Sequence, residues 1–347
     1  MLFVSFFPQL IAGPIVHHGE MMPQLSIFNR ERWAKDVAEG MTLFVFGLFK
    51  KVVIADSLMK YVGGPFGMVA SGVDVNIITA WVAVMAYTFQ IYYDFSGYSD
   101  MALGLARMFG VHLPLNFNAP YKATSITDFW RRWHITLSHF LRDYIYVPLG
   151  GSRQGRLRLI MNLLITMLIG GLWHGANWTF LWWGLAHGLF LTINHLWVKI
   201  FEERRRIRFP KLVKTFYWGV TFFSVMLGWV LFRSESVSAA VGMYSTLFAF
   251  DGLVLPLVWQ DLFVVTESIR FVGESDWAAS IFLVVILFFT LMSPNCRDLF
   301  DLDIVLKGKS NTIKWEPTVR WAFFVSCLFL FTLGNMSSVS EFLYFQF

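Results

Sequence analysis

Long apolar runs alternate with short polar stretches along most of this chain. The runs that approach the length of a membrane span cover residues 75–93, 157–174, 177–198, 215–232, 277–292 and 319–333. About 20 consecutive, mostly apolar residues cross the hydrocarbon core of a bilayer as a helix. The pattern therefore predicts about six full membrane-spanning helices.

Other stretches are too short or too mixed to be assigned as spans. Residues 1–16 are apolar but contain Pro8 and Pro14, which favours a re-entrant or partial segment. The charged stretch 29–39 is expected at the surface. Residues 236–273 give no pattern that we can assign.

Charged residues interrupt two otherwise apolar regions. Residues 41–61 contain Lys50 and Lys51, which is typical of a helix that dips in from an interface with its lysines reaching outward. Asp94 and Asp100 follow the first full span, and a short amphipathic helix is expected directly after Asp100. These two carboxylates are candidates for helix capping or ion pairing, or for lining a cavity.

The composition also indicates a membrane protein. Hydrophobic residues make up 56% of the 347 residues, and the mean hydropathy is +0.56. A soluble domain has roughly 45–50% apolar residues. No Pro-, Ser- or Gly-rich linker and no fixed repeat divides the chain, so residues 1–347 are expected to form one domain. The predicted fold class is an all-α integral membrane protein, a polytopic helical bundle with re-entrant or partial helices.

The net charge of +5 is explained by membrane topology. Arg153, Arg156 and Arg158 precede the run 157–174, and a second basic group lies within residues 199–214. Two spans return the chain to the side it left, so both basic loops are predicted to be cytoplasmic by the positive-inside rule. The charge therefore gives no reason to expect a nucleic-acid partner.

One helix is predicted over residues 125–146, with Thr127 as its N-cap and Asp128 near the positive end of its dipole. The residues that recur at three and four positions on one face are Trp130, Trp133, His134, Leu137 and Leu141. The imidazole on this face is expected to lie inward among aromatic rings, whereas Arg131 and Arg132 occupy other faces.

His174 is the leading candidate for chemistry. It ends an apolar run and is flanked by Trp173 and Gly175, with Asn177 close behind. Sixteen residues of helix, roughly 24 Å, separate it from Arg158 and the cytoplasmic loop. An imidazole in a partly dry cavity is a natural general base for a hydroxyl group. The alternative is a histidine that forms hydrogen bonds between helices for packing alone.

His134 has the same two interpretations, and His187 is a further candidate on an inward-facing helix surface. No metal site is expected, because His134 and His139 are five residues apart and no carboxylate joins them in a metal-binding pattern. No Gly-x-Ser-x-Gly elbow and no phosphate-binding Gly-rich loop occurs, which argues against a serine hydrolase or a nucleotide-driven pump.

Several longer motifs occur in a fixed order. They are Pro8-Gln-Leu-Ile-Ala-Gly-Pro-Ile15, Asp94-Phe-Ser-Gly-Tyr-Ser-Asp100, Asn116-Phe-Asn-Ala-Pro120, Asp128-Phe-Trp-Arg-Arg-Trp-His134, Arg142-Asp-Tyr-Ile-Tyr-Val-Pro-Leu-Gly-Gly-Ser152 and Gly171-Leu-Trp-His-Gly175. At these residues the sequence resembles the membrane-bound O-acyltransferase family, in particular the bacterial branch typified by alginate O-acetyltransferase. In that family further hydrophobic segments usually precede the first of these motifs, which here starts at residue 8.

The resemblance implies that His174 is the catalytic histidine and that His134 is a second active-site residue. His174 would act as general base or transient acyl carrier, and His134 would orient the acceptor or stabilise the oxyanion. The bundle would surround a central funnel in which donor and acceptor meet. Further candidates for lining it are Asp128, Trp130, Arg131, Arg132, Trp173, Asn177 and His187.

The implied reaction moves an acetyl group from a cytoplasmic thioester, acetyl-CoA, to an extracytoplasmic exopolysaccharide, with no bound cofactor. The implied location is the bacterial inner membrane, and the implied partner is a periplasmic polysaccharide acetyltransferase. Two alternatives stay open. One is a D-alanyl or lipid acyltransferase of the same family, although the motif Pro148-Leu-Gly-Gly-Ser-Arg153 favours the polysaccharide branch. The other is a non-enzymatic transporter or channel.

Overall fold

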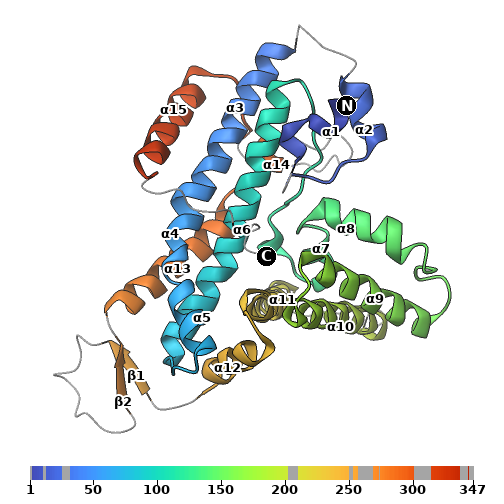
Figure 1. The fold of residues 1–347 in the computed structure, drawn as a ribbon. Helices are drawn as coiled ribbons and strands as arrows, with labels where there is room; N and C mark the ends of the chain where they lie inside the picture. Colours follow the sequence, from blue (N-terminus) through green and yellow to red (C-terminus); the bar gives the residue numbers. More distant parts are fainter. Residues whose placement is uncertain are drawn as a thin grey trace.

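Helices form nearly all of the regular structure in the computed structural model of the chain (Figure 1). The structure describes residues 2–10, 13–25, 32–201, 210–249, 253–256, 269–272, 274–300, 314–336 and 343. Within these ranges the exception is one parallel pair of short strands, β1 (Leu253–Pro256) and β2 (Ile269–Val272). The expected all-α class is confirmed apart from this small pair.

The first half contains α1 (Leu2–Ser5), the 3-10 helix η1 (Phe7–Gln9), α2 (His18–Leu25), α3 (Trp33–Phe49), the π-helix η2 (Lys50–Ala55), α4 (Asp56–Met59), α5 (Gly63–Ala70) and α6 (Ile77–Met108). The middle contains the 3-10 helix η3 (Pro120–Lys122), α7 (Ile126–Trp130), α8 (Ile135–Leu141), the π-helix η4 (Arg142–Tyr146), α9 (Arg156–His174) and α10 (Trp178–Phe201). The last part contains α11 (Pro210–Arg233), α12 (Val237–Leu247), α13 (Glu274–Met292), α14 (Cys296–Phe300) and α15 (Val319–Gly334).

Helices α3 and α6 lie side by side along the centre of the molecule (Figure 1), because glycines face each other at two levels. A Cβ atom added to Gly40 would lie 2.5 Å from the carbonyl oxygen of Gly104, and one added to Gly104 would lie 2.5 Å from that of Gly40. Seven residues along each helix, Gly47 and Gly97 repeat this arrangement at 2.5 and 2.7 Å. The absent side chains let the two backbones touch, as in small-residue interfaces between membrane helices.

Two lysines of η2, which directly follows α3, form ion pairs with buried carboxylates of α6. Lys51 Nζ lies 2.6 Å from Asp94 Oδ1, and Lys50 Nζ lies 2.5 Å from Asp100 Oδ2. The ion-pairing alternative for the two carboxylates is confirmed. The expected break after Asp94 and the outward lysines are wrong, since α6 is one helix of 32 residues and both lysines turn inward. A carboxylate buried in a helix interface needs a nearby cation to offset its desolvation.

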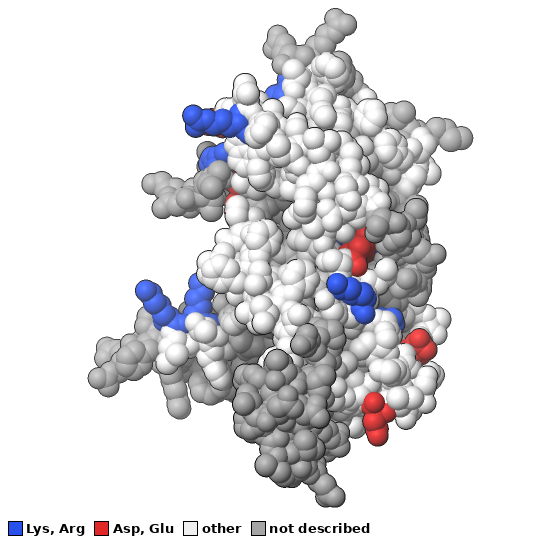
Figure 2. Space-filling view, turned by 90° about the vertical axis from the view of Figure 1, so that its left-hand side faces the viewer, with Lys and Arg blue, Asp and Glu red and all other residues white. Residues whose placement is uncertain are grey.

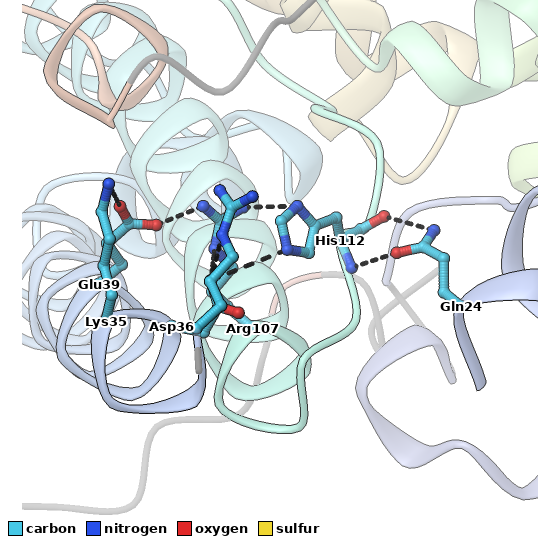
Figure 3. A network of polar contacts seen from close by, with 7 residues as sticks. Gln24, Lys35, Asp36, Glu39, Arg107 and His112 are labelled. Carbon is cyan, nitrogen blue, oxygen red and sulfur yellow. Dashed lines mark hydrogen bonds and ion pairs between the residues drawn. The ribbon is translucent and has the colours of Figure 1, made fainter. Parts of the chain in front are cut away.

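A second polar network ties α2, α3 and the end of α6 together (Figure 3). Arg107 forms ion pairs with Asp36, at 3.2 Å, and with Glu39, and it hydrogen-bonds Nδ1 of His112 at 2.8 Å. The backbone N–H of His112 donates to Gln24 Oε1 at 2.8 Å. Asp36 and Glu39 are each 4% exposed, so the expectation that this charged stretch lies at the surface is wrong for them.

The two helices predicted on either side of the short Gly175 connection are present as α9 and α10, which pack against each other. A Cβ atom at Gly171 would collide with the carbonyl oxygen of Phe180, and one at Gly184 would collide with that of Met167. This close hairpin lies to one side of α6, together with α7, α8 and α11 (Figure 1). It places His174 at the turn between two tightly packed helices.

Two helices in the described part of the chain are long and apolar enough to cross a membrane by length and composition, α9 and the Lys211–Arg233 part of α11. Trp277–Met292 and Val319–Gly334 are shorter apolar helices. The full count of about six spans stays a prediction. The basic stretch 202–209 and the aromatic tail, apart from residue 343, lie outside the described residues.

The outer surface is unusually apolar. Large apolar side chains that are more than 60% exposed stand on α13 and α15; they are Ile281, Val284, Phe288, Met292, Val319, Phe323 and Leu330. Figure 2 faces the side on which α15 lies, and there the described charged side chains are few and separate, with a continuous uncharged surface between them. Large exposed apolar side chains with few charges around them are typical of a surface that contacts a membrane or a partner.

Candidate functional site

The chain bends sharply at His134, between α7 and α8. The prediction of one helix over residues 125–146 is therefore wrong. His134 has a φ of 41°, in the left-handed region that is strained for a residue with a side chain. Asn116 holds the bend, because its carbonyl oxygen accepts the N–H of Ile135 at 3.0 Å. The N-cap of α7 is Ser125, whose Oγ accepts the N–H of Asp128 at 3.1 Å, and not Thr127.

The side chain of Asn116 also fixes the imidazole of His134, which is 3% exposed. Asn116 Oδ1 lies 3.0 Å from His134 Nδ1 and accepts the hydroxyl of Thr136 at 3.0 Å. Because this oxygen is an acceptor, Nδ1 of His134 is the protonated nitrogen and Nε2 carries the basic lone pair. The geometry therefore presents Nε2 for chemistry.

His174 ends α9 within a group of aromatic rings. Its imidazole lies 5.3 Å from the ring of Trp183 and 5.1 Å from that of Phe232, both in edge-on contact. Trp173 connects His174 to the chain bend at His134, since the Trp173 ring lies 5.1 Å from the ring of His174 and 6.1 Å from that of His134. The two histidines predicted to carry the chemistry thus contact the same indole.

His187, on α10, is fully buried beside this group. The rings around it are those of Phe129, Trp130, Trp183, Phe190 and Trp229. Trp183 contacts both His187, at 4.9 Å, and His174, at 5.3 Å. The sequence-predicted residues His134, His174, His187, Trp130 and Trp173 therefore form one continuous cluster with Trp183, which we call the histidine cluster.

The other predicted residues make different contacts. Arg132 Nε donates to Asp128 Oδ1 at 2.8 Å, and each side chain is 31% exposed. Arg131 is exposed. Asn177 Nδ2 donates to the carbonyl oxygen of Glu235 at 3.0 Å. Asp128 and Arg132 thus form an ion pair with each other. Asn177 connects the α9–α10 turn to the segment that follows α11.

Sequence reasoning missed Asn116 and Trp183 as members of the site. Asn116 opens the motif Asn116-Phe-Asn-Ala-Pro120, and its place in that motif was the available signal. The structure shows that Asn116 is fully buried. Trp183 gave no signal, because tryptophans are frequent along the whole chain. Among the described residues, no three or more His, Cys, Asp or Glu side chains group in a way that could hold a metal ion.

One pocket lies at these elements, and a larger cavity lies among α3, α6, α13 and α15. A pocket of about 170 Å³ lies between α7, α8, α9 and α10, lined by Trp130, Ser138, Leu141, Thr166 and Met167 among others. A larger cavity of about 380 Å³ is lined by Lys50, Tyr92, Cys296 and mostly apolar side chains, and shares no residue with the histidine cluster. The smaller pocket is the one that adjoins the cluster, through Trp130.

Comparisons with a family model and with known proteins agree on one family. The family model for membrane-bound O-acyltransferases matches residues 1–237. The peptidoglycan O-acetyltransferase of Helicobacter pylori is 40% identical over 100% of this chain and 64% of its own length. The probable alginate O-acetylase of Azotobacter vinelandii is 46% identical over 73% of this chain and 48% of its own length.

A more distant relative is named for the transfer of a different group, D-alanyl. The teichoic acid D-alanyltransferase of Streptococcus thermophilus is 28% identical over 66% of this chain and 60% of its own length. The chain spans between about half and two thirds of the length of these three relatives.

Proposed function

Because the chain belongs to the membrane-bound O-acyltransferase family, we propose that it passes an acetyl group from a cytoplasmic thioester to a hydroxyl acceptor, for the O-acetylation of an extracytoplasmic polysaccharide. The observation that carries this proposal is the contact of His134 and His174 with the same indole, that of Trp173. Two imidazoles in one aromatic cluster can serve one acceptor hydroxyl and one acyl group.

In the proposed reaction, His174 takes the proton of the acceptor hydroxyl as its oxygen attacks the carbonyl carbon of the thioester. The new C–O ester bond forms, the C–S bond breaks, and the leaving thiolate takes the proton from His174. Nε2 of His134, held by the Nδ1 bond to Asn116, orients the acceptor hydroxyl. Aromatic walls around both imidazoles keep bulk water from competing with that hydroxyl.

Acetyl is the acyl group that the comparisons favour. The relatives that are 40% and 46% identical are named for O-acetyl transfer, whereas the D-alanyltransferase is 28% identical. Alginate and peptidoglycan, the acceptors in those names, both offer saccharide hydroxyl groups. We place an alginate-like exopolysaccharide first, because of the motifs shared with that branch.

The donor in this proposal is acetyl-CoA, which approaches from the basic end of α9. Arg153, Arg156 and Arg158 lie there and would attract its phosphates. Since His174 is at the opposite end of α9, the acetyl group would leave toward the other side of the bacterial inner membrane. A periplasmic acetyltransferase would then place it on the polymer.

The test is polysaccharide O-acetylation in a bacterial host that lacks its own transferase, with matched membrane levels of each variant. The unchanged chain should acetylate the polymer, and His174→Ala should abolish acetylation. His195→Ala is the matched control, because its imidazole is on α10 and Nδ1 bonds the carbonyl oxygen of Leu191. Full acetylation by the His174→Ala variant would remove His174 from the proposed role.

Two rival functions give different results in the same membranes. A D-alanyl or lipid acyltransferase would use a carrier-bound or long-chain donor, and acetyl-CoA would not compete with it. A transporter or channel would keep its flux after His174→Ala. Acetylation that depends on both acetyl-CoA and His174 would exclude both rivals.

A further inference from the structure

Four buried nitrogen atoms in the histidine cluster have no hydrogen-bond partner among the described residues. They are Nε1 of Trp130, Nε1 of Trp183 and both ring nitrogens of His187. His187 is fully buried, Trp183 is 1% exposed and Trp130 is 9% exposed. An unsatisfied buried polar group destabilises the folded state, so such groups are normally paired with a hydrogen-bond partner.

These unsatisfied nitrogens are carried by three rings in mutual contact. The ring of His187 lies 4.9 Å from Trp183 and 5.3 Å from Trp130, and the two indoles lie 5.9 Å apart. The neighbouring indole of Trp229 does have a partner, since its Nε1 donates to the hydroxyl of Tyr121 at 3.1 Å. Four of the 13 buried side-chain atoms without a hydrogen-bond partner in the described part of the chain therefore lie on these three contacting rings.

That place is next to the proposed chemistry, and Trp130 joins it to the pocket. Trp183 contacts His174 at 5.3 Å, and Trp130 lines the pocket of about 170 Å³. Thr166 and Met167 of that pocket lie eight and seven residues before His174 on α9, about two helical turns away, and Met167 is on the same face as His174. At this volume the pocket is below the roughly 300–1,000 Å³ of sites for drug-sized ligands, which suits a short acyl group.

The donor and acceptor capacities define the ligand. An indole N–H can only donate, and neutral imidazole has one N–H donor. The two indole N–H groups and the one imidazole N–H are satisfied by an oxygen with free lone pairs and no charge that would need a counter-ion. The other ring nitrogen of His187 is an acceptor and is not satisfied by such an oxygen. A carbonyl oxygen meets both requirements, and it gains negative charge as a thioester is attacked, when hydrogen-bond donors stabilise it most.

We propose that Trp130, Trp183 and His187 form the binding site for the carbonyl oxygen of the donor's acyl group. This inference deepens the proposed acetyl transfer and rests on it for the identity of the donor. It assigns the N–H groups of Trp130 and Trp183 a direct role in stabilising the oxyanion, while His174 handles the proton.

The substitutions Trp130→Phe and Trp183→Phe test the site, because each removes the N–H and keeps an aromatic ring. The full-length chain is purified, and its unfolding temperature is measured with S-acetyl-N-acetylcysteamine, a small acetyl thioester. The control ligand is S-ethyl-N-acetylcysteamine, which lacks the thioester carbonyl oxygen. The thioester should raise the unfolding temperature of the parent more than the thioether does, and both variants should lose this difference.

The matched control variant is Trp218→Phe, whose indole Nε1 donates to the carbonyl oxygen of Tyr121 at 2.8 Å. It should lose stability, since it leaves that oxygen unpaired, but keep the preference for the thioester. Trp130→Phe and Trp183→Phe should not lose stability without ligand. In acetyl transfer they should lower kcat by about 10²–10³-fold with a smaller change in KM, as removal of an oxyanion donor does.

Two results would overturn the site. One is a preference for the thioester that survives both substitutions. The other is a loss of stability in Trp183→Phe as large as in Trp218→Phe, which would mean that a buried water already satisfies the N–H. If the parent prefers the thioester but transfers no acetyl group, the proposed function fails while the carbonyl site stands.

Discussion

Asn116 fixes His134 through a 3.0 Å hydrogen bond between Oδ1 and Nδ1. The same asparagine accepts the hydroxyl of Thr136 and, through its backbone oxygen, the N–H of Ile135. One buried residue thus sets the conformation, orientation and tautomer of the imidazole. A positioned acid–base or hydrogen-bonding group depends on such support for its contribution to the rate.

Replacing Asn116 with Leu should therefore reduce acetyl transfer by about 10²-fold, the lower end of what a positioned acid–base group contributes. The side chain keeps its size but loses the acceptor for His134. Asn118→Leu is the control, since Asn118 Oδ1 accepts from Asn295 Nδ2 at 2.8 Å and does not support His134. Parental transfer by Asn116→Leu, at equal membrane levels, would show that His134 needs no such support.

The glycine contacts between α3 and α6 predict a specific loss of stability. Gly47→Ala would place a methyl group 2.5 Å from the carbonyl oxygen of Gly97, so the helices must separate. Overpacking of this kind costs about 1–3 kcal/mol. The unfolding temperature of the purified protein should fall accordingly.

Gly219→Ala is the control for this substitution. Gly219 lies inside α11, and no atom lies within 4 Å of the position that its Cβ would take. Alanine there should raise stability by about 0.5–1 kcal/mol, because glycine is unfavourable in a helix interior. Equal behaviour of the two variants would mean that backbone contact does not hold α3 against α6.

The apolar runs predicted the positions of most long helices in the structure. The run 277–292 lies within α13, 319–333 lies within α15, and 157–174 corresponds to α9. These predictions agree with the structure because the bounds of an apolar run set the bounds of a helix, whichever other helices it packs against. The family resemblance also brought His134 and His174 into consideration before their shared indole was known.

The features that sequence reasoning missed depend on distant partners. The break before α8 is held by Asn116, 18 residues upstream of His134, so the helical spacing of residues 125–146 contained no sign of it. Asp100 lies inside α6 because Lys50, 50 residues earlier, pairs with it. Periodicity describes one helix at a time and cannot reveal which charges meet across two.

The buried Lys50–Asp100 pair predicts a large effect from removing one partner. Asp100→Ala would leave the Lys50 ammonium, 20% exposed, without its counter-ion. Breaking a buried ion pair in this way costs about 3–5 kcal/mol. The double variant Lys50→Met, Asp100→Leu should recover most of this loss in unfolding measurements, because apolar replacements of a buried pair are often neutral.

An exposed pair provides the comparison. Arg142 Nε lies 2.7 Å from Asp143 Oδ1, with side chains 55% and 41% exposed. Asp143→Ala should change stability by less than about 1 kcal/mol, as expected for a surface ion pair. A loss as large as that of Asp100→Ala would show that burial does not distinguish the two pairs.

His112 gives the network at the end of α6 a pH dependence. The guanidinium of Arg107 can only donate, so Nδ1 of His112 accepts, and Nε2 lies 3.8 Å from Asp36 Oδ1. Burial, and after it the charge of Arg107, holds the pKa of His112 below its ordinary value of 6.5. The folded state therefore binds a proton less readily at this residue than the unfolded state does.

The sign of the effect follows from this difference. Above about pH 6.5 neither state protonates His112, and its contribution to stability is fully present. As the pH falls below that value, the unfolded state takes up the proton first, and stability is lost until the folded pKa is reached. The unfolding temperature of the parent should thus fall more steeply between about pH 7.5 and 5.5 than that of His112→Gln, whose amide oxygen can still accept from Arg107. His18→Gln, on the exposed surface of α2, should follow the parent. If the parent and His112→Gln lose stability in parallel, protonation of His112 is not coupled to folding.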